Sequence, residues 1–326
     1  MTEQQSSAAS GIVLGANQYG KAEVRVVKVT RDTARHEIDD LNVTSQLRGD
    51  FSAAHLAGDN AHVVPTDTQK NTIFAFARDG IGSPEAFLLR LADHFTGSFD
   101  WVTGGRWEAE KFAWQRIVAH GEPHDHSFVR SGQEVRTALV VVEGAGGGVG
   151  GTGGTGGGGG DRTRHVLAGL KELTVLKTTE SGFEGYPRDR YTTLPETRDR
   201  ILATDVSARW LYRGAGVDAG FDYDAAYDSV RGLLLETFTE GYSAALQTTL
   251  FDMGRRVLER HDEIAEIRLS MPNKHHFVVD LSPFGLDNPN EVFYAADRPY
   301  GLIEAAVVRE GVDSPAAAWE AVAGFC

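Results

Sequence analysis

One helix is plain from residues 83–95, which read SPEAFLLRLADHF. Ser83 is a favourable N-cap residue, and Pro84 suits the first helical position, where an N–H would have no helical partner. The apolar residues that follow recur at the spacing of one helix face: Phe87, Leu88, Leu91 and Phe95. The stretch therefore predicts an amphipathic helix whose apolar face packs on the core.

Strands are predicted on both sides of this helix. Residues 20–29 alternate between apolar and charged side chains, with a period of two that is typical of a half-buried strand. Two more strands are expected before the helix, at residues 38–47 and 71–77. After it we expect a second helix and then two strands, at residues 106–117, 127–130 and 135–142.

The second half of the chain repeats this order. Its strands, helices and final strands are expected in turn at residues 173–178, 203–212, 224–238, 243–260, 264–270, 276–281 and 302–309. Strands, two helices and strands, twice over, predict an α+β fold of duplicated halves with each helical pair on one sheet face. Because such a sheet leaves its other face uncovered, we expect an oligomer.

A glycine-rich tract divides the chain near its middle. Between residues 144 and 160, 13 of 17 residues are glycine, and such a stretch buries too little apolar surface to offset its backbone entropy. Its G-x-G-x-x-G match lacks the helix that a dinucleotide site requires directly afterwards. We therefore divide the chain into a disordered tail, a first half, a flexible loop, a second half and a C-terminal tail, at residues 1–11, 12–143, 144–160, 161–310 and 311–326.

Composition excludes several classes of protein. The 326 residues carry 32 Lys and Arg against 46 Asp and Glu, a net charge of −14, so no basic footprint for a nucleic acid is visible. No apolar run of about 18 residues could span a membrane. The one cysteine, Cys326, can neither close an internal disulfide nor build a thiolate zinc site. Without an apolar leader or a C-terminal Ser-Lys-Leu, we expect a cytoplasmic protein.

Short polar clusters are the candidates for chemistry, and each also has a purely structural explanation. Lys21 alternates with charged residues on a strand face, and Thr66-Asp67 is favourable turn chemistry. His124 and His126 share one side of an extended segment and could hold a metal, but the sequence nominates no third ligand. Spacing alone therefore predicts an α+β oligomer and no particular reaction.

Taken together, the clusters resemble the uricase (urate oxidase) family. Six motifs occur in order from about residue 12 to residue 309: Tyr19-Gly20-Lys21; Thr66-Asp67 with Lys70-Asn71-Thr72; His124-x-His126-Ser127-Phe128; Leu173-Thr174-Val175-Leu176-Lys177; Tyr191-Thr192-Thr193-Leu194 with Asp199-Arg200-Ile201-Leu202; and Pro272-Asn273-Lys274-His275. One such tetrapeptide is weakly specific, whereas six in register are highly specific.

This resemblance implies the tunnelling fold, with two tandem β-β-α-α-β-β halves in each subunit, antiparallel sheets and helices on one face. Four subunits would stack into a barrel around a tunnel, with active sites shared at the subunit interfaces. The implied reaction oxidises urate with dioxygen and water to 5-hydroxyisourate and hydrogen peroxide, with no metal and no organic cofactor.

The resemblance also implies which residues carry the reaction. Lys21, Thr66 and His275 match the family's proton relay, in which the lysine is the general base and the histidine passes protons onward. The residues that match its substrate-binding positions are Thr66, Asp67, Phe183, Arg200, Leu246, Gln247 and Asn273.

Three of these residue types suit a flat anion directly. Arg200 offers a planar fork of donors to the pyrimidine side of urate, Gln247 grips the opposite edge of that ring, and Phe183 stacks under the purine. With Ser243 as the N-cap, Leu246 falls at the third helical position, where its free backbone N–H faces the anion.

The remaining positions imply a site shared between subunits. Asn273 matches the side chain that holds water or dioxygen above the ring, and Thr66 and Asp67 match backbone donors from the neighbouring subunit. We therefore expect a monomer to be inactive. Two alternatives stay open: a metal-dependent purine- or pterin-binding enzyme of the same fold, and a non-catalytic purine-binding oligomer.

Overall fold

A computed structural model describes residues 12–144, 162–218, 220–320, 322 and 324–325. The predicted N-terminal tail and all but the first residue of the predicted glycine-rich loop lie outside the described residues.

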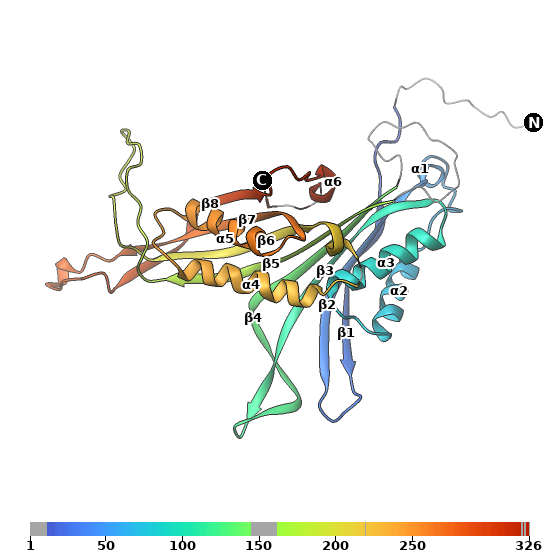
Figure 1. Cartoon of the computed structure of the whole chain (residues 1–326), viewed down its shortest axis with the longest axis horizontal. Coiled ribbons are helices and arrows are strands. Elements are labelled where there is room, and N and C mark those ends of the chain that lie inside the picture. Colours follow the sequence, from blue (N-terminus) through green and yellow to red (C-terminus); the bar gives the residue numbers. More distant parts are fainter. Residues whose placement is uncertain (1–11, 145–161, 219, 321, 323, 326) are drawn as a thin grey trace, which may run out of the picture.

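Eight antiparallel strands form a single sheet in which each strand pairs with the next along the chain (Figure 1). In order they are β1 Tyr19–Thr30, β2 Glu37–Gly49, β3 Val102–Ala119, β4 Glu122–Glu143, β5 Thr163–Lys177, β6 Leu202–Tyr212, β7 Ile264–Val278 and β8 Phe293–Val308. The two halves of the chain join where β4 pairs with β5, and β1 and β8 are the edges.

Four long helices cover one face of this sheet (Figure 1). They are α2 Thr66–Arg78, α3 Pro84–Ser98, α4 Tyr223–Thr239 and α5 Leu246–Arg260; shorter elements are α1 Ser52–Ala57, α6 Ala316–Trp319, η1 Gly214–Val217 and η2 Ser282–Phe284. Ser83 caps α3 by accepting a hydrogen bond from the Ala86 N–H, as predicted. The α+β class is confirmed, since strands, helices and strands follow one another twice. No helix of the described part is long and apolar enough to cross a membrane.

Two element assignments in the first half are wrong. Residues 71–77, expected as a strand, lie in α2, because Gln69, Ile73 and Ala77 bury one face at a helical spacing of four. Residues 106–117, expected as a helix, lie in β3. There Trp107 and Ala109 face the core, and they alternate with the charged residues Arg106, Glu108 and Glu110, which is the period of a strand.

The second half also departs from the prediction, since β5 and β8 begin at Thr163 and Phe293 rather than at residues 173 and 302, and β7 differs as well. Residues 264–278 form one continuous strand, β7, rather than two strands with a connection around residues 271–275. Its pairing with β8 shifts register between Asn273 and His275. A β-bulge of this kind re-aims side chains without ending the strand.

Both faces of the sheet carry apolar cores. The larger core lies under the helices and spans both halves, with Trp107 and Trp210 completely buried. A smaller cluster on the opposite face includes Leu139, Leu167 and Leu211 and is covered by Trp319 of α6. The predicted C-terminal tail thus contains a short helix that packs on the sheet.

Arg136 of β4 ties the helical layers of the two halves together. Its Nη2 donates to Oε2 of Glu85 on α3 over 2.8 Å, and its Nη1 donates to Asp224 on α4. The guanidinium also lies 4.4 Å from the ring centroid of Tyr227. The Glu85 side chain is completely buried, so it depends on Arg136 for a compensating charge.

We predict that Arg136→Met lowers the free energy of unfolding by about 3–5 kcal/mol, because it leaves a buried carboxylate without its partner. Urea unfolding followed by tryptophan fluorescence measures this loss. Arg164→Met is the matched control, since Arg164 pairs with Asp93 at the surface and such pairs contribute only about 0–1 kcal/mol. Equal losses in the two variants would contradict the role assigned to Arg136.

Candidate active site

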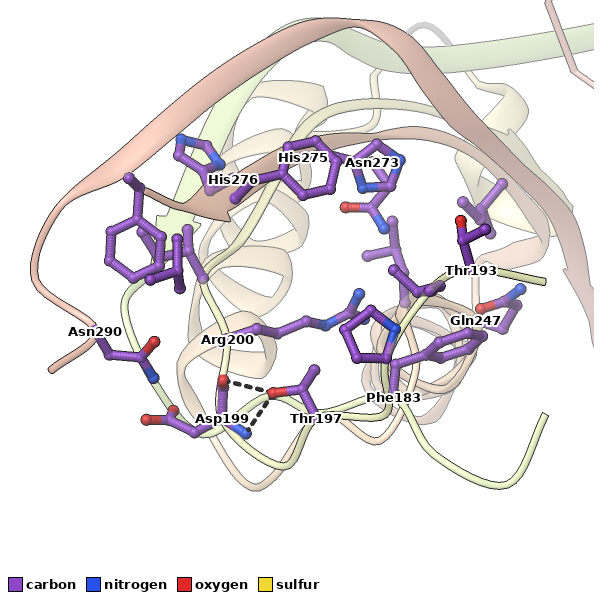
Figure 2. A pocket seen from close by; sticks show the side chains of 18 residues that line it. Phe183, Thr193, Thr197, Asp199, Arg200, Gln247, Asn273, His275, His276 and Asn290 are labelled. Carbon is purple, nitrogen blue, oxygen red and sulfur yellow. Dashed lines mark hydrogen bonds between the residues drawn. The ribbon is translucent and has the colours of Figure 1, made fainter. Parts of the chain in front are cut away.

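A cavity of about 760 Å³ opens in the second half of the chain, at the end of the sheet where β7 and β8 meet the segment after β5. Figure 2 shows its lining side chains, with Arg200 reaching into the middle, Phe183 and Gln247 on one side and Asn273 and His275 opposite. Leu246 also lines it. Six of the predicted residues are therefore brought around one space.

Phe183 is held with one ring face covered. Its backbone N–H donates to the Thr197 carbonyl over 2.7 Å, and the Thr197 N–H donates back over 3.2 Å. Its ring stacks on that of Tyr186 with a centroid distance of 4.8 Å and an interplanar angle of 13°. A planar ligand can therefore stack only on the face away from Tyr186, and the Arg200 Cζ lies 5.5 Å from the same ring centroid.

Arg200 brings a partly desolvated positive charge into the cavity. Its backbone N–H donates to the Ser181 carbonyl over 2.9 Å, and its Nε donates to the Ser181 hydroxyl over 3.4 Å. Burial lowers the pKa of the guanidinium, but an arginine ordinarily titrates above about pH 12 and stays charged at pH 7. Away from bulk water this charge attracts an anion more strongly.

The N-terminus of α5 also faces the cavity. Its N-cap is Ala245, which makes no side-chain capping bond, so the prediction that Ser243 caps this helix is wrong. Leu246 and Gln247 occupy the first two helical positions, whose N–H groups have no partner within a helix. The Ser243 hydroxyl instead bonds to the hydroxyl of Thr249.

Asn273 and His275 come from β7, two residues apart across the bulge, and both line the cavity. Burial lowers the pKa of the His275 imidazole, and electrostatic repulsion from Arg200 and His276 lowers it further. His275 is therefore neutral at pH 7 and can accept a proton.

Lys21, Thr66 and Asp67 do not line this cavity and lie in the first half of the chain. Lys21 is on the edge strand β1, and Thr66 and Asp67 are the first residues of α2. The hydrogen bond from Lys70, with its charge, lowers the pKa of the Asp67 carboxyl, and the charge of Lys21 adds to the effect. One chain thus holds the predicted site as two separate groups.

Local packing keeps the first-half group together. The Tyr19 hydroxyl donates to the Val64 carbonyl over 3.2 Å, which ties the start of β1 to the residues just before α2. Gly20 allows β1 to approach closely, since a Cβ there would lie 1.8 Å from the Ser45 carbonyl oxygen. The N-cap of α2 is Pro65, which also provides no side-chain cap.

The two histidines considered for a metal lie in the β3–β4 hairpin. Their rings are 4.5 Å apart, and His36 is the third imidazole nearby, 5.8 Å from His126. Among the described residues, no group of three or more His, Cys, Asp or Glu side chains is arranged to hold a metal. The geometry therefore gives no support to the metal interpretation.

Two residues that build the site were not predicted. Tyr186 supports the Phe183 ring from behind, and Ser181 contacts Arg200 twice. Both touch other side chains rather than the cavity, so residue type and spacing carry no signal for them. His276 and Asn290, which do line the cavity, were also missed.

Comparison with known proteins agrees with this geometry. The Uricase family model matches residues 17–141 and 166–304. The chain is 61% identical over 322 residues to the uricase of Arthrobacter globiformis, covering 99% of this chain and 98% of the relative. It is 36% identical over 298 residues to the uricase of Danio rerio, covering 90% and 93%.

Solved structures give the same result. The crystal structure of the Arthrobacter globiformis uricase superposes with a TM-score of 0.84 at 62% identity, covering 94% of this chain and 98% of that one. A urate oxidase from Bacillus sp. TB-90 superposes with a TM-score of 0.76 over 90% of this chain, and at 22% identity it supports the fold alone. On sequence and structure together, the chain belongs to the uricase family.

Proposed function

We propose that this protein is a urate oxidase that converts urate, dioxygen and water to 5-hydroxyisourate and hydrogen peroxide. The observation that carries the proposal is the cavity in which a charged planar fork, an aromatic ring with one face turned away from Tyr186 and an open helix N-terminus converge. Each of these features binds a flat anion, and together they match the substrate that the family name specifies.

Urate binding follows from the cavity walls. The urate ring stacks on the face of Phe183 away from Tyr186, the Arg200 guanidinium donates to adjacent acceptors on the pyrimidine side, and the Gln247 amide binds the opposite edge of that ring. The Leu246 N–H donates from the positive end of the α5 dipole. These groups hold the anion without taking part in electron transfer.

Proton removal is the chemistry that the protein must supply. Triplet dioxygen reacts slowly with singlet organic molecules, so urate must become electron-rich enough to give up an electron, and loss of protons makes it a stronger reductant. Lys21 acts as the general base through the Thr66 hydroxyl, and neutral His275 passes protons onward. Asn273 holds dioxygen or water above the ring.

Two helix N-termini left open support a site assembled from two subunits. Ser83 and Asp222 cap α3 and α4 with their side chains, whereas the N-caps of α2 and α5 make no such bond. Thr66 and Asp67 lie at the first of these open ends, and Leu246 and Gln247 lie at the second. Because one chain holds the groups apart, a second copy would bring its α2 to this chain's α5, as in the proposed homotetramer.

The function is tested by mixing the protein with urate under air. We expect the ultraviolet absorbance of urate to fall while hydrogen peroxide is released in equal amount. Binding of urate without loss of absorbance would favour a non-catalytic purine-binding oligomer. If the protein neither binds urate nor consumes it, urate is excluded as the substrate.

We predict that exhaustive chelation leaves turnover unchanged, because the proposed steps use only protein side chains, urate and dioxygen. Urate consumption is measured before and after dialysis against a chelator. If chelation abolished activity and one added metal restored it, the metal-dependent alternative would replace this proposal.

We predict that Arg200→Lys weakens urate binding by about 1.5–3 kcal/mol, the scale of hydrogen bonds to a charged group, because lysine keeps the charge and loses the fork. Titration with the unreactive purine analogue azaxanthine measures the change. Arg198→Lys is the matched control, since Arg198 lies on the same segment but pairs with Glu184. An unchanged titration for Arg200→Lys would show that Arg200 does not contact the substrate.

We predict that Lys21→Met and Thr66→Val each lower the steady-state rate by about 10²–10⁴-fold, the usual contribution of a general base, with little effect on azaxanthine affinity. The double variant should be little slower than the slower single variant, because both residues serve one proton path. Lys28→Met and Thr72→Val are controls on the same strand and helix. The relay is contradicted if the rate losses of the two single variants multiply fully in the double variant. It is also contradicted if azaxanthine affinity falls together with the rate.

A further inference from the structure

Ser181 contacts Arg200 through both its main chain and its side chain. The Arg200 backbone N–H donates to the Ser181 carbonyl over 2.9 Å, and the Arg200 Nε–H donates to the Ser181 hydroxyl over 3.4 Å. Ser181 is completely buried, so water does not compete for its hydroxyl oxygen. One residue, Ser181, therefore fixes both the backbone and the Nε of Arg200.

The segment that carries Ser181 is itself fixed to the start of α5. Ser181 forms an isolated parallel bridge with Ser243, in which the Gly182 N–H donates to the Ser243 carbonyl over 2.9 Å and the Ser243 N–H donates to the Glu180 carbonyl over 2.8 Å. The Ser243 hydroxyl then bonds to Thr249 in the first turns of α5. One bridge therefore joins the wall that carries Arg200 to the wall that carries Gln247.

The close packing of this bridge leaves little freedom. A Cβ at Gly182 would lie 2.9 Å from the Thr197 carbonyl oxygen and 1.9 Å from the Tyr242 hydroxyl oxygen. Thr197 in turn pairs with the backbone of Phe183. One short segment, residues 180–183, thus carries the stacking ring and contacts both Arg200 and the residues just before α5.

We propose that Ser181 is a positioning residue that makes the Arg200 guanidinium meet its ligand end-on, through the two terminal nitrogens. A guanidinium can bind a pair of acceptors either with Nη1 and Nη2 or with Nε and one Nη. Because Ser181 accepts the Nε–H, only the terminal pair is left for a purine edge. The inference rests on the proposed role of Arg200 in binding urate.

The test combines single and double variants with azaxanthine titration and steady-state kinetics on urate. We expect Ser181→Ala to weaken azaxanthine binding about fivefold to tenfold and to raise KM by a similar factor, the scale of one ordinary hydrogen bond. We expect kcat to stay within about twofold, because Ser181 is outside the proton path. If Ser181→Ala fails to fold, Ser181→Cys keeps the size, offers a poorer acceptor and carries the same expectations.

A double-variant cycle separates positioning from packing. In the Arg200→Lys background, Ser181→Ala should weaken binding no further, because its effect acts through the guanidinium. Ser243→Ala acts on α5 instead, so its effect should multiply with that of Arg200→Lys. The control is Ser229→Ala, which removes a 2.8 Å hydrogen bond to His261 outside the cavity; it should change thermal stability alone.

Three results would overturn the positioning role of Ser181. Unchanged azaxanthine affinity in Ser181→Ala, effects that multiply fully with Arg200→Lys, or a fall in kcat at constant KM would each overturn the positioning role. If Arg200→Lys itself leaves azaxanthine binding unchanged, the proposed role of Arg200 fails instead. The two failures are therefore distinguishable within one set of titrations.

Discussion

The hydrogen-bond ladder between β4 and β5 is the constraint on which the rest of the molecule depends. It pairs Val135 with Lys171 at one end and Glu143 with Thr163 at the other, and so makes one sheet of two halves. A continuous sheet lets the four long helices share one core, and it gives Arg136 a helix on each side to bind. It also separates β1 from β8, so the two groups of site residues cannot meet within one chain.

Both halves contain a long helix without a side-chain N-cap, and different side chains surround it in each half. Each half has one long helix whose N-cap makes no side-chain bond: α2, at Pro65, is the first of its pair, and α5, at Ala245, is the second of its pair. In the second half this helix end lines one cavity with Arg200, Phe183 and Gln247, which we propose bind the substrate. In the first half it lies near Lys21, which we propose as the general base. The two halves therefore have a similar order of strands and helices, and their side chains differ in the roles that we propose.

Prediction from the sequence succeeded where local signals and tertiary packing agree. The helix at α3 has a cap, a proline and a clear period, whereas α2 begins at Pro65 without a capping side chain. Strand β3 was mistaken for a helix because its charged residues are good helix formers, and only its neighbours β2 and β4 impose the extended form. Motifs identified the residues around the cavity, but Ser181 and Tyr186 act through other side chains, which no spacing reveals.

The order of the strands has a consequence for how the chain folds. Since each strand pairs with the one made just before it, every pairing can form as soon as its second strand is made, but β2–β3 and β6–β7 must first wait for residues 50–101 and 213–263, which carry the helices. The Trp319 contact is different, because it covers residues from β4 to β7 and comes after β8 in the chain. During synthesis from the N-terminus this apolar patch therefore stays exposed after β8 has been made, until Ala318 and Trp319 have also emerged.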